Sequence, residues 1–318
     1  MKHMKKSILI LGMVFGMVNG VGAETYRDVV IGDNPISYWR LGESGLVNGG
    51  SQMVDEMGNN HGVYYSYPNN GSTGGSVSGV EGAIHGDGNT AIEFGKIQSA
   101  NPAAYTYGGA VVIPDAGEEA DDFTFVGGTQ SFSIEAWWKR DVDDVVTMGG
   151  FISIFSKANI ANGKGYALTL GGFGEADGKT TFTELRLTAY GAGGGHIKST
   201  SDIEYEVGEW YHIVATYQAS GLVKLYLNGE EVASANSFGI PTTSEMPAMI
   251  GAIGNTSMSN VPKIYAPFPG VIDEVAVYNY AVSGEQVATH FNAAAIPEPG
   301  LTVLLGLAGL LCAGRRRS

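Results

Sequence analysis

The feature that most constrains the fold of this chain is an alternation of apolar and polar side chains near its middle. In Ser131–Lys139 every second residue from Phe132 to Trp138 is apolar. Glu209–Tyr217 and Leu222–Asn228 alternate in the same way. A period of two residues is the period of a strand with one buried face. We therefore expect a core built from β-strands.

Short turns connect the alternating segments. Gln218–Gly221 joins two of them as a hairpin, and Asn228-Gly229 is a strong turn signal that leads into a strand over Glu230–Ser234. One helix is predicted, over Ser283–Phe291, because Ser283 and the glutamine three residues later form a capping box. Further strands are predicted over Ile36–Leu41, Gly62–Tyr65, Ala91–Phe94, Phe151–Lys157, Tyr166–Leu170, Thr183–Ala189, Ala248–Ala252 and Gly270–Tyr278.

The composition agrees with an all-β sandwich. Glycine is frequent, at 48 of 318 residues, and charged residues are few, at 16%, as in short strands joined by glycine-rich turns. The single cysteine, Cys312, lies near the C-terminus. A domain without disulfides must be stabilised by a large core or by a metal ion. No repeat or domain boundary is visible, so we expect one sandwich or jelly roll.

The charge excludes nucleic acid as a partner. The whole chain has a formal charge of −14, and six of its 18 basic residues lie in the two terminal segments described below. Without them the net charge is about −20, which repels a phosphate backbone. Such a surface suits divalent cations, or an acidic extracellular matrix bridged by cations.

The first 23 residues have the parts of a secretory signal peptide. A basic start precedes the apolar run Ser7–Val18, and the small residues Val21 and Ala23 mark a cleavage site before Glu24. An N-terminal membrane anchor is the alternative, but the run is too short to span a bilayer comfortably. We therefore expect an exported protein.

Residues 293–318 predict a linker and a membrane-sorting tail. The apolar run Leu301–Gly314 would form a helix of about 21 Å, shorter than the bilayer core of ~30 Å. A Pro-Glu-Pro motif, this short transmembrane helix and a cluster of arginines together resemble the PEP-CTERM sorting signal of Gram-negative bacteria. The resemblance implies processing by an exosortase, membrane contact before processing and association with extracellular polysaccharide; a generic tail anchor is the alternative. The motif residues are Pro297, Glu298, Pro299, Arg315, Arg316 and Arg317.

Blocks of sequence between the two ends resemble LamG-like domains, which have the concanavalin A-like jelly-roll β-sandwich. Examples are FSIEAW at 132–137, WYHIVATY at 210–217 and LYLNG at 225–229. Others lie at 26–43, 55–62, 86–94 and 269–283, and all follow the order of the family. The resemblance implies one all-β domain over residues 24–292.

The resemblance also implies a structural Ca²⁺ that joins an N-terminal loop to an acidic residue of the last strand. Calcium takes oxygen ligands from carboxylates, amides and backbone carbonyls. The matching residues are Asp55, Asn59 and Asp273, with Gly58 contributing its carbonyl. The alternative is that the first two stabilise a turn and that Asp273 faces solvent.

Sugar binding would use the face of an aromatic ring. Trp137 alternates with serine and glutamate residues, whereas Trp138 alternates with phenylalanine and isoleucine. The pattern therefore predicts an exposed Trp137 as the ligand-binding residue, although in a sandwich either ring could belong to the core.

Catalytic signatures are weak. Glycoside hydrolases need two carboxylates about 5–9.5 Å apart, which on one strand means a spacing of two or four residues. Glu204 and Glu206 have that spacing, as do Asp202 and Glu204. The laminarinase-type signature of Glu, Asp and Glu on one strand face is absent, because the Glu-x-Asp pairs that begin at Glu119 and Glu175 are not followed by a nearby glutamate. The domain also lacks a cysteine nucleophile and a Gly-x-Ser-x-Gly motif. We expect no catalytic residues.

Together these features predict an exported, non-catalytic protein of the cell surface, outer membrane or extracellular matrix of a Gram-negative bacterium. It would bind glycans or other extracellular ligands in adhesion or exopolysaccharide association. Two alternatives remain open: a purely structural matrix component, and a polysaccharide hydrolase on the same fold that uses Glu204 and Glu206.

Overall fold

The computed structural model describes most of the chain between the two ends. Apart from Glu24, the described residues belong to one compact unit, Thr25–Glu298. The predicted signal peptide, the predicted sorting tail and Glu204 lie outside the described residues. The described residues are 24–46, 49–66, 77–94, 109–114, 122–125, 127–140, 151–176, 179–191, 195–198, 205–236, 239, 241–257, 264–265 and 268–294.

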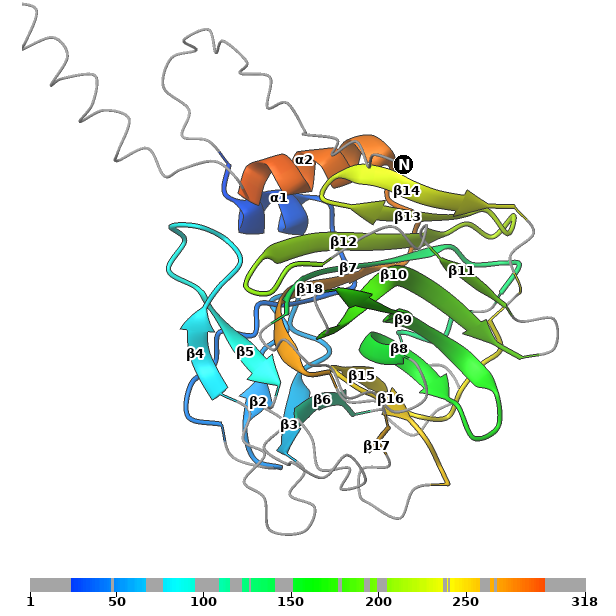
Figure 1. Ribbon diagram of the computed structural model, residues 1–318, viewed down its shortest axis with the longest axis horizontal. Helices are drawn as coiled ribbons and strands as arrows, with labels where there is room; N and C mark the ends of the chain where they lie inside the picture. The colour runs from blue at the N-terminus through cyan, green and yellow to red at the C-terminus, as the bar shows by residue number, and fades with distance from the viewer. Residues whose placement is uncertain are drawn as a thin grey trace, which may run out of the picture. The chain divides into compact units, whose positions relative to one another are not determined.

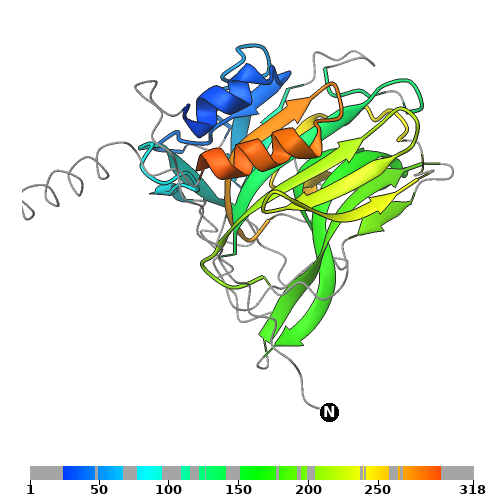
Figure 2. The ribbon, with the colours of Figure 1, turned by 90° about the horizontal axis from the view of Figure 1, so that it is seen from above.

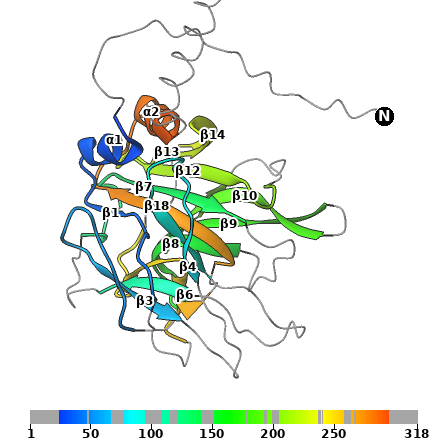
Figure 3. The ribbon, with the colours of Figure 1, turned by 90° about the vertical axis from the view of Figure 1, so that its left-hand side faces the viewer.

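Two β-sheets form this unit, and they lie on either side of the main core (Figures 1 and 3). The eight-stranded sheet has the order β14 (Glu230–Ala235), β13 (Val223–Leu227), β12 (Trp210–Tyr217), β7 (Phe132–Lys139), β18 (Gly270–Tyr278), β5 (Thr90–Phe94) and β4 (Val77–Glu81), and β1 (Ser37–Trp39) also pairs with β18. The ten-stranded sheet has the order β11 (His196–Lys198), β10 (Lys179–Tyr190), β9 (Lys164–Ala176), β8 (Phe151–Asn159), β15 (Ala248–Ile250), β6 (Gly109–Ile113), β3 (Gly62–Ser66) and β2 (Gln52–Met53), joined by β16 (Ile253–Gly254) and β17 (Ile264–Tyr265).

The predicted alternation is confirmed in the central strands. Phe132 and Trp138 of β7 face the main core, which also contains Leu168 of the ten-stranded sheet. The predicted strand Gly270–Tyr278 has those bounds in the structure, whereas Tyr166–Leu170 is the middle of the longer β9. The fold is an all-β sandwich consistent with a jelly roll.

Two helices lie on the outer face of the eight-stranded sheet, the face turned away from the other sheet (Figures 2 and 3). Helix α2 (Gly284–Ala294) begins with the predicted capping box: the Ser283 amide donates to Gln286 Oε1 at 2.9 Å, and the Gln286 amide donates to Ser283 Oγ at 3.2 Å. Among the described residues, neither helix has the length and apolar character needed to cross a membrane.

Helix α1 (Tyr26–Gly32) was not expected from the sequence, so the prediction of a single helix is wrong. Its N-cap is Thr25, whose Oγ1 accepts a hydrogen bond from the Asp28 amide at 3.2 Å. With only 7 residues the helix is too short to show a clear helical period, and it is held by packing on the sheet rather than by propensity.

Candidate functional site

The outer face of the eight-stranded sheet carries the polar side chains that alternate with the core residues. β7 pairs with β12 so that His212 is opposite Trp137 and Trp210 is opposite Lys139. β18 pairs with the other edge of β7, with Asp273 opposite Trp137. Because residues opposite each other in a sheet point to the same side, these five side chains share the outer face.

Trp137 does point outward, but the prediction that it is exposed is wrong. Only 5% of the residue is accessible to solvent. Its ring stacks on Phe291 of α2, with centroids 5.9 Å apart, and meets the edge of Tyr26 of α1 at 6.2 Å. The two helices cover this part of the sheet, so the ring is not available to a ligand.

Glu135 lies in the centre of the covered area and is fully buried. Oε1 is 2.8 Å from His212 Nε2 and accepts from the Tyr26 hydroxyl at 2.9 Å, and Oε2 is 2.9 Å from His290 Nδ1 and accepts from the Tyr278 hydroxyl at 3.0 Å. We call Glu135, His212, His290, Tyr26 and Tyr278, together with Asp33, the histidine network.

The histidine network keeps its glutamate charged. Burial alone would raise the pKa of Glu135, but the charge of His290 and the hydrogen bonds from both histidines hold this pKa well below its usual range. Burial alone would lower the pKa of His290, but Glu135 and then Asp33, which lies 2.9 Å from its Nε2, raise it to about 9. The network therefore fastens both helices to the sheet as a buried ion cluster.

A β-bulge in β18 creates a second buried cluster. The pairing with β7 shifts between Asp273 and Ala276, and Glu274 has a φ of +52°, in the left-handed region. Asp273, opposite Trp137, and Ala276, opposite Glu135, both face outward. The extra residue of the bulge allows Glu274 to point to this side as well, next to Asp273.

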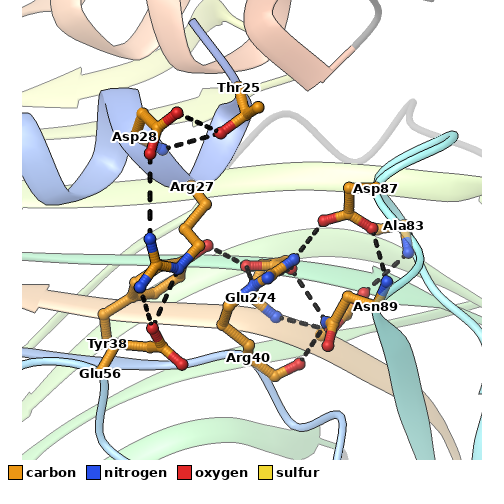
Figure 4. A network of polar contacts seen from close by, with 11 residues as sticks. Thr25, Arg27, Asp28, Tyr38, Arg40, Glu56, Ala83, Asp87, Asn89 and Glu274 are labelled. Atoms are coloured by element: carbon orange, nitrogen blue, oxygen red, sulfur yellow. Dashed lines mark hydrogen bonds and ion pairs between the residues drawn. The ribbon is translucent and has the colours of Figure 1, made fainter. Parts of the chain in front are cut away.

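Arg40 and Asn89 hold the carboxylate of Glu274 (Figure 4). An Arg40 guanidinium nitrogen donates to Glu274 Oε1 at 3.0 Å and also pairs with Asp87. The side-chain amide of Asn89 donates to Glu274 Oε1 at 3.1 Å and to the backbone carbonyl of Arg40 at 2.8 Å. We call Asp273, Glu274, Arg40, Asp87 and Asn89, with Tyr38, the bulge network.

The two buried carboxyl groups of the bulge network, those of Asp273 and Glu274, have pKa values above the usual range. Burial is the largest cause that raises the pKa of Glu274; Arg40 and Tyr38 oppose it, Asp87 adds to it, and the value is about 7. Burial and then the charge of Glu274 raise the pKa of Asp273 well above its usual range. One arginine does not compensate three neighbouring carboxylates.

The bulge network also fixes the loop between β4 and β5. The backbone amide of Ala83 donates to Asp273 Oδ2 at 2.8 Å, and the Asn89 amide reaches Asp273 Oδ1 at 3.4 Å. This loop is one wall of a cavity of about 560 Å³ on the outer face of the sheet. Glu81, Gly82, Ala83, Ile84, His85, Gly86, Gly88, Asn89, Lys139, Gly208 and Trp210 line the cavity.

Lys139 and Trp210 form the wall opposite the loop. They are register partners at the end of β7 and the start of β12, and each is half-buried. Lys139 Nζ lies 4.7 Å from the centroid of the Trp210 ring, a cation–π contact. The cavity thus has an aromatic side chain, a cation and an exposed carboxylate, that of Glu81. Its volume is in the range of small-molecule sites.

The predicted calcium ligands already make hydrogen bonds within the protein at Asp55 and Asp273. Asp55 is buried, and each of its oxygens accepts two backbone hydrogen bonds: Oδ1 from Tyr38 and Met57 at 2.8 and 3.0 Å, Oδ2 from Asn59 and Asn60 at 3.2 and 2.9 Å. These four bonds use the acceptor capacity of a carboxylate. Asp55 in this arrangement stabilises a turn and does not fit a calcium ligand.

The other three predicted ligands have different surroundings. Asn59 and Gly58 are exposed, whereas Asp273 is fully buried in the bulge network and does not face solvent. The described part of the chain contains no group of three or more His, Cys, Asp or Glu side chains placed to hold a metal ion. Calcium binding stays a prediction.

Of the two glutamates considered for hydrolysis, Glu206 is exposed.

The sequence pattern of the concanavalin A-like lectin/glucanases superfamily matches residues 105–288 of this chain. The chain belongs to this superfamily. The match covers more than half of the sequence, including β7, β12 and β18, and confirms the central part of the LamG-like resemblance. Comparison with curated protein sequences gave no match.

Solved structures with similar folds come from several bacterial proteins. The binding domain of Paraclostridial Mosquitocidal Protein 1 is 14% identical, with a TM-score of 0.50; the alignment covers 82% of this chain and 52% of that one. Domain 4 of AbnA, a GH43 extracellular arabinanase from Geobacillus stearothermophilus solved with arabinotriose, is 21% identical, with 74% and 91% coverage and a TM-score of 0.45. The CBM40 of a Ruminococcus gnavus sialidase, bound to α2,3-sialyllactose, is 14% identical, with 50% and 82% coverage and a TM-score of 0.38. At these identities the similarities concern the fold alone.

Sequence reasoning missed the aromatic residue and the cation of the cavity. Trp210 and Lys139 lie at the ends of two strands that the alternation did predict. The signal that could have found them is position: a side chain at the end of an outward-facing row is beyond the reach of a helix that covers the middle of that row. Trp137, in the middle, is covered instead.

Proposed function

We propose that this protein is an exported, non-catalytic protein that binds glycans in the cavity between Trp210, Lys139 and the β4–β5 loop. The observation that carries the proposal is the cavity of about 560 Å³, in which a half-buried tryptophan lies beside charged groups. An apolar ring with a few hydrogen-bonding groups is the combination that sugar binding uses. Membership of a superfamily described by lectins and glucanases supports a carbohydrate ligand.

The residues on the two sides of the cavity would contribute differently to sugar binding. The Trp210 ring offers apolar contact to the C–H groups of a sugar, and the carboxylate of Glu81 accepts hydrogen bonds from hydroxyl groups. The opposite wall is held by the bond from Ala83 to Asp273 and by the bonds of Asn89. A wall fixed before the ligand arrives reduces the entropy lost on binding.

Binding is tested with the full-length protein on a broad array of bacterial and plant glycans, followed by calorimetry with the best ligand. Trp210→Ala should weaken binding by about ten-fold or more, a loss of about 1.4 kcal/mol. Tyr265→Ala is the matched control, because Tyr265 is a half-buried aromatic residue of the other sheet. Circular dichroism checks that both variants keep the fold.

Three outcomes would contradict this function. A silent array would favour the purely structural matrix component, and equal binding by Trp210→Ala would place the site elsewhere. Reducing sugar released from a polysaccharide, and abolished by Glu206→Gln, would make the protein a hydrolase.

Export and sorting belong to the same proposal. We propose that residues 1–23 direct secretion in a Gram-negative bacterium and that an exosortase processes the tail, so that the mature protein associates with extracellular polysaccharide. Mass spectrometry of the protein isolated from its host tests both ends. A mature chain that starts at Glu24 and lacks the arginine cluster is expected, and retention of both ends would overturn the proposal.

A further inference from the structure

We infer that the cavity selects an acidic sugar, a uronic acid unit whose carboxylate pairs with Lys139; this inference rests on the proposed glycan-binding function and names its ligand class. The cavity has one lysine, one glutamate and one histidine in its lining. Which of these groups is available to a ligand depends on the contacts that each already makes.

Lys139 differs from the other basic side chains on the described surface. Within the described residues its ammonium contacts the Trp210 ring at 4.7 Å and has no carboxylate at ion-pair distance. Five other basic side chains there do have such a partner, even though the chain is rich in acidic residues: Arg27, Arg40, Lys164, Arg186 and Lys224.

The Trp210 ring positions the Lys139 ammonium but accepts none of its hydrogen bonds. An aromatic face attracts a cation but offers no lone pair, so the three N–H groups of the ammonium remain free to donate to a ligand. Register pairing places Lys139 directly beside Trp210, and the ammonium lies over the ring. A ligand that reaches the ring therefore also meets the ammonium group.

The carboxylate of Glu81 restricts where the acidic group of a ligand can lie in the cavity. Glu81 ends β4, on the side of the cavity formed by the loop, and would repel a carboxylate there. A uronic acid would therefore bind with its carboxylate toward Lys139 and its hydroxyl groups toward Glu81. Because the net charge of the chain is −14, long-range attraction does not favour an acidic ligand, and the selection is local.

The experiment compares two probes that differ only in the acidic group. Calorimetry measures the full-length protein with an oligogalacturonide and with the same oligosaccharide after its carboxyl groups are reduced to alcohols. The acidic probe should bind about ten-fold more tightly. In Lys139→Met the ratio of the two affinities should fall to about one, and in Lys139→Arg most of the preference should remain. Lys224→Met, on β13 of the same sheet, is the control and should keep the wild-type ratio.

The outcomes separate this inference from the proposed function. If the reduced probe binds as tightly as the acidic one and Trp210→Ala weakens both, glycan binding stands and the acidic preference is wrong. A preference that survives in Lys139→Met also overturns it. If neither probe binds but a neutral glycan from the array does, the ligand class is wrong. A protein that binds no glycan at all contradicts the proposed function itself. Circular dichroism of each Lys139 variant excludes loss of the fold as the cause.

Discussion

Glu135 and Glu274 are buried on the same face of the same sheet, yet their surroundings shift their pKa values in opposite directions. Glu135 lies between two histidines, which hold its pKa well below the usual range. Glu274 shares one arginine with Asp87 and lies beside Asp273, and its pKa is about 7. Because burial is complete for both, the opposite directions of the two pKa shifts come from the balance of charged and hydrogen-bonding neighbours.

The two networks also hold different parts of the molecule in place. The histidine network fastens two helices, and its central carboxylate is the acceptor for several buried donors. The bulge network holds the loop that forms one wall of the cavity, and it contains more negative charge than its arginine compensates. We expect the first network to contribute most to stability and the second to respond most to pH near neutrality.

The largest expected effect is that of Glu135→Gln. Breaking a buried ion cluster by removing one partner typically costs about 3–5 kcal/mol, because the remaining charges stay buried. Glu274→Gln should cost about 1 kcal/mol or less at pH 8, because the raised pKa of Glu274 means that its ionised form stabilises the folded protein little. Urea unfolding of both variants at pH 8 provides the measurement.

A surface pair provides the control for this comparison. Glu231→Gln breaks an exposed ion pair with Lys224 and should change the free energy of unfolding by less than about 1 kcal/mol. If Glu135→Gln does not fold, Tyr278→Phe is a milder probe of the same network, with an expected loss of about 1 kcal/mol. Equal losses in Glu135→Gln and Glu274→Gln would break the comparison.

A smaller effect is expected in the dependence of stability on pH. The folded pKa of His290, about 9, is above its usual 6.5, so its stabilisation is complete below about pH 6.5 and is lost as pH rises through 9. The folded pKa of Glu274, about 7, is above its usual 4.5, so the folded protein holds a proton that the unfolded chain has released, and stability falls as pH rises from 4.5 to 7.

Unfolding curves between pH 4.5 and pH 10 separate the two networks. Glu274→Gln should reduce the fall between pH 4.5 and 7, to which the raised pKa of Asp273 also contributes, and should leave the fall near pH 9. His290→Gln should remove the fall near pH 9 and leave the fall at lower pH. Glu135 adds a loss only as pH falls below 4.5, because its folded pKa is lowered. A profile that neither variant changes would contradict both assignments.

The smallest effect is expected from metal removal, which tests the calcium prediction. Since both oxygens of Asp55 accept backbone hydrogen bonds, EDTA should shift the melting temperature of the purified protein by less than about 1 °C. Addition of Ca²⁺ after EDTA is the control. A drop of several degrees that Ca²⁺ restores would show that the turn rearranges around a bound ion and would confirm the predicted calcium site.

Much of the fold could be predicted from the sequence because its causes are local. The alternation in Ser131–Lys139 identifies both faces of β7, and Ser283 with Gln286 gives the start of α2. Whether an outward side chain is exposed is not local, because it depends on which element packs on the sheet. Trp137 shows this: its direction was predicted correctly, and its burial under α1 and α2 was not.

The candidate site was less predictable for the same reason. A regular strand would place Asp273 and Glu274 on opposite faces, and only the bulge, with its positive φ, brings both to the outer face. The bulge has no signal in the sequence, since the left-handed residue is a glutamate rather than a glycine. The cavity then forms where a loop meets the ends of three strands that are far apart in the sequence.

A crystal structure of the protein with its tightest glycan from the array tests the account most directly. We predict a sugar ring against Trp210, with an acidic group at Lys139 Nζ and hydroxyl groups at Glu81. A sugar bound on the outer face of the ten-stranded sheet, with the Trp210 cavity filled only by water, would contradict it.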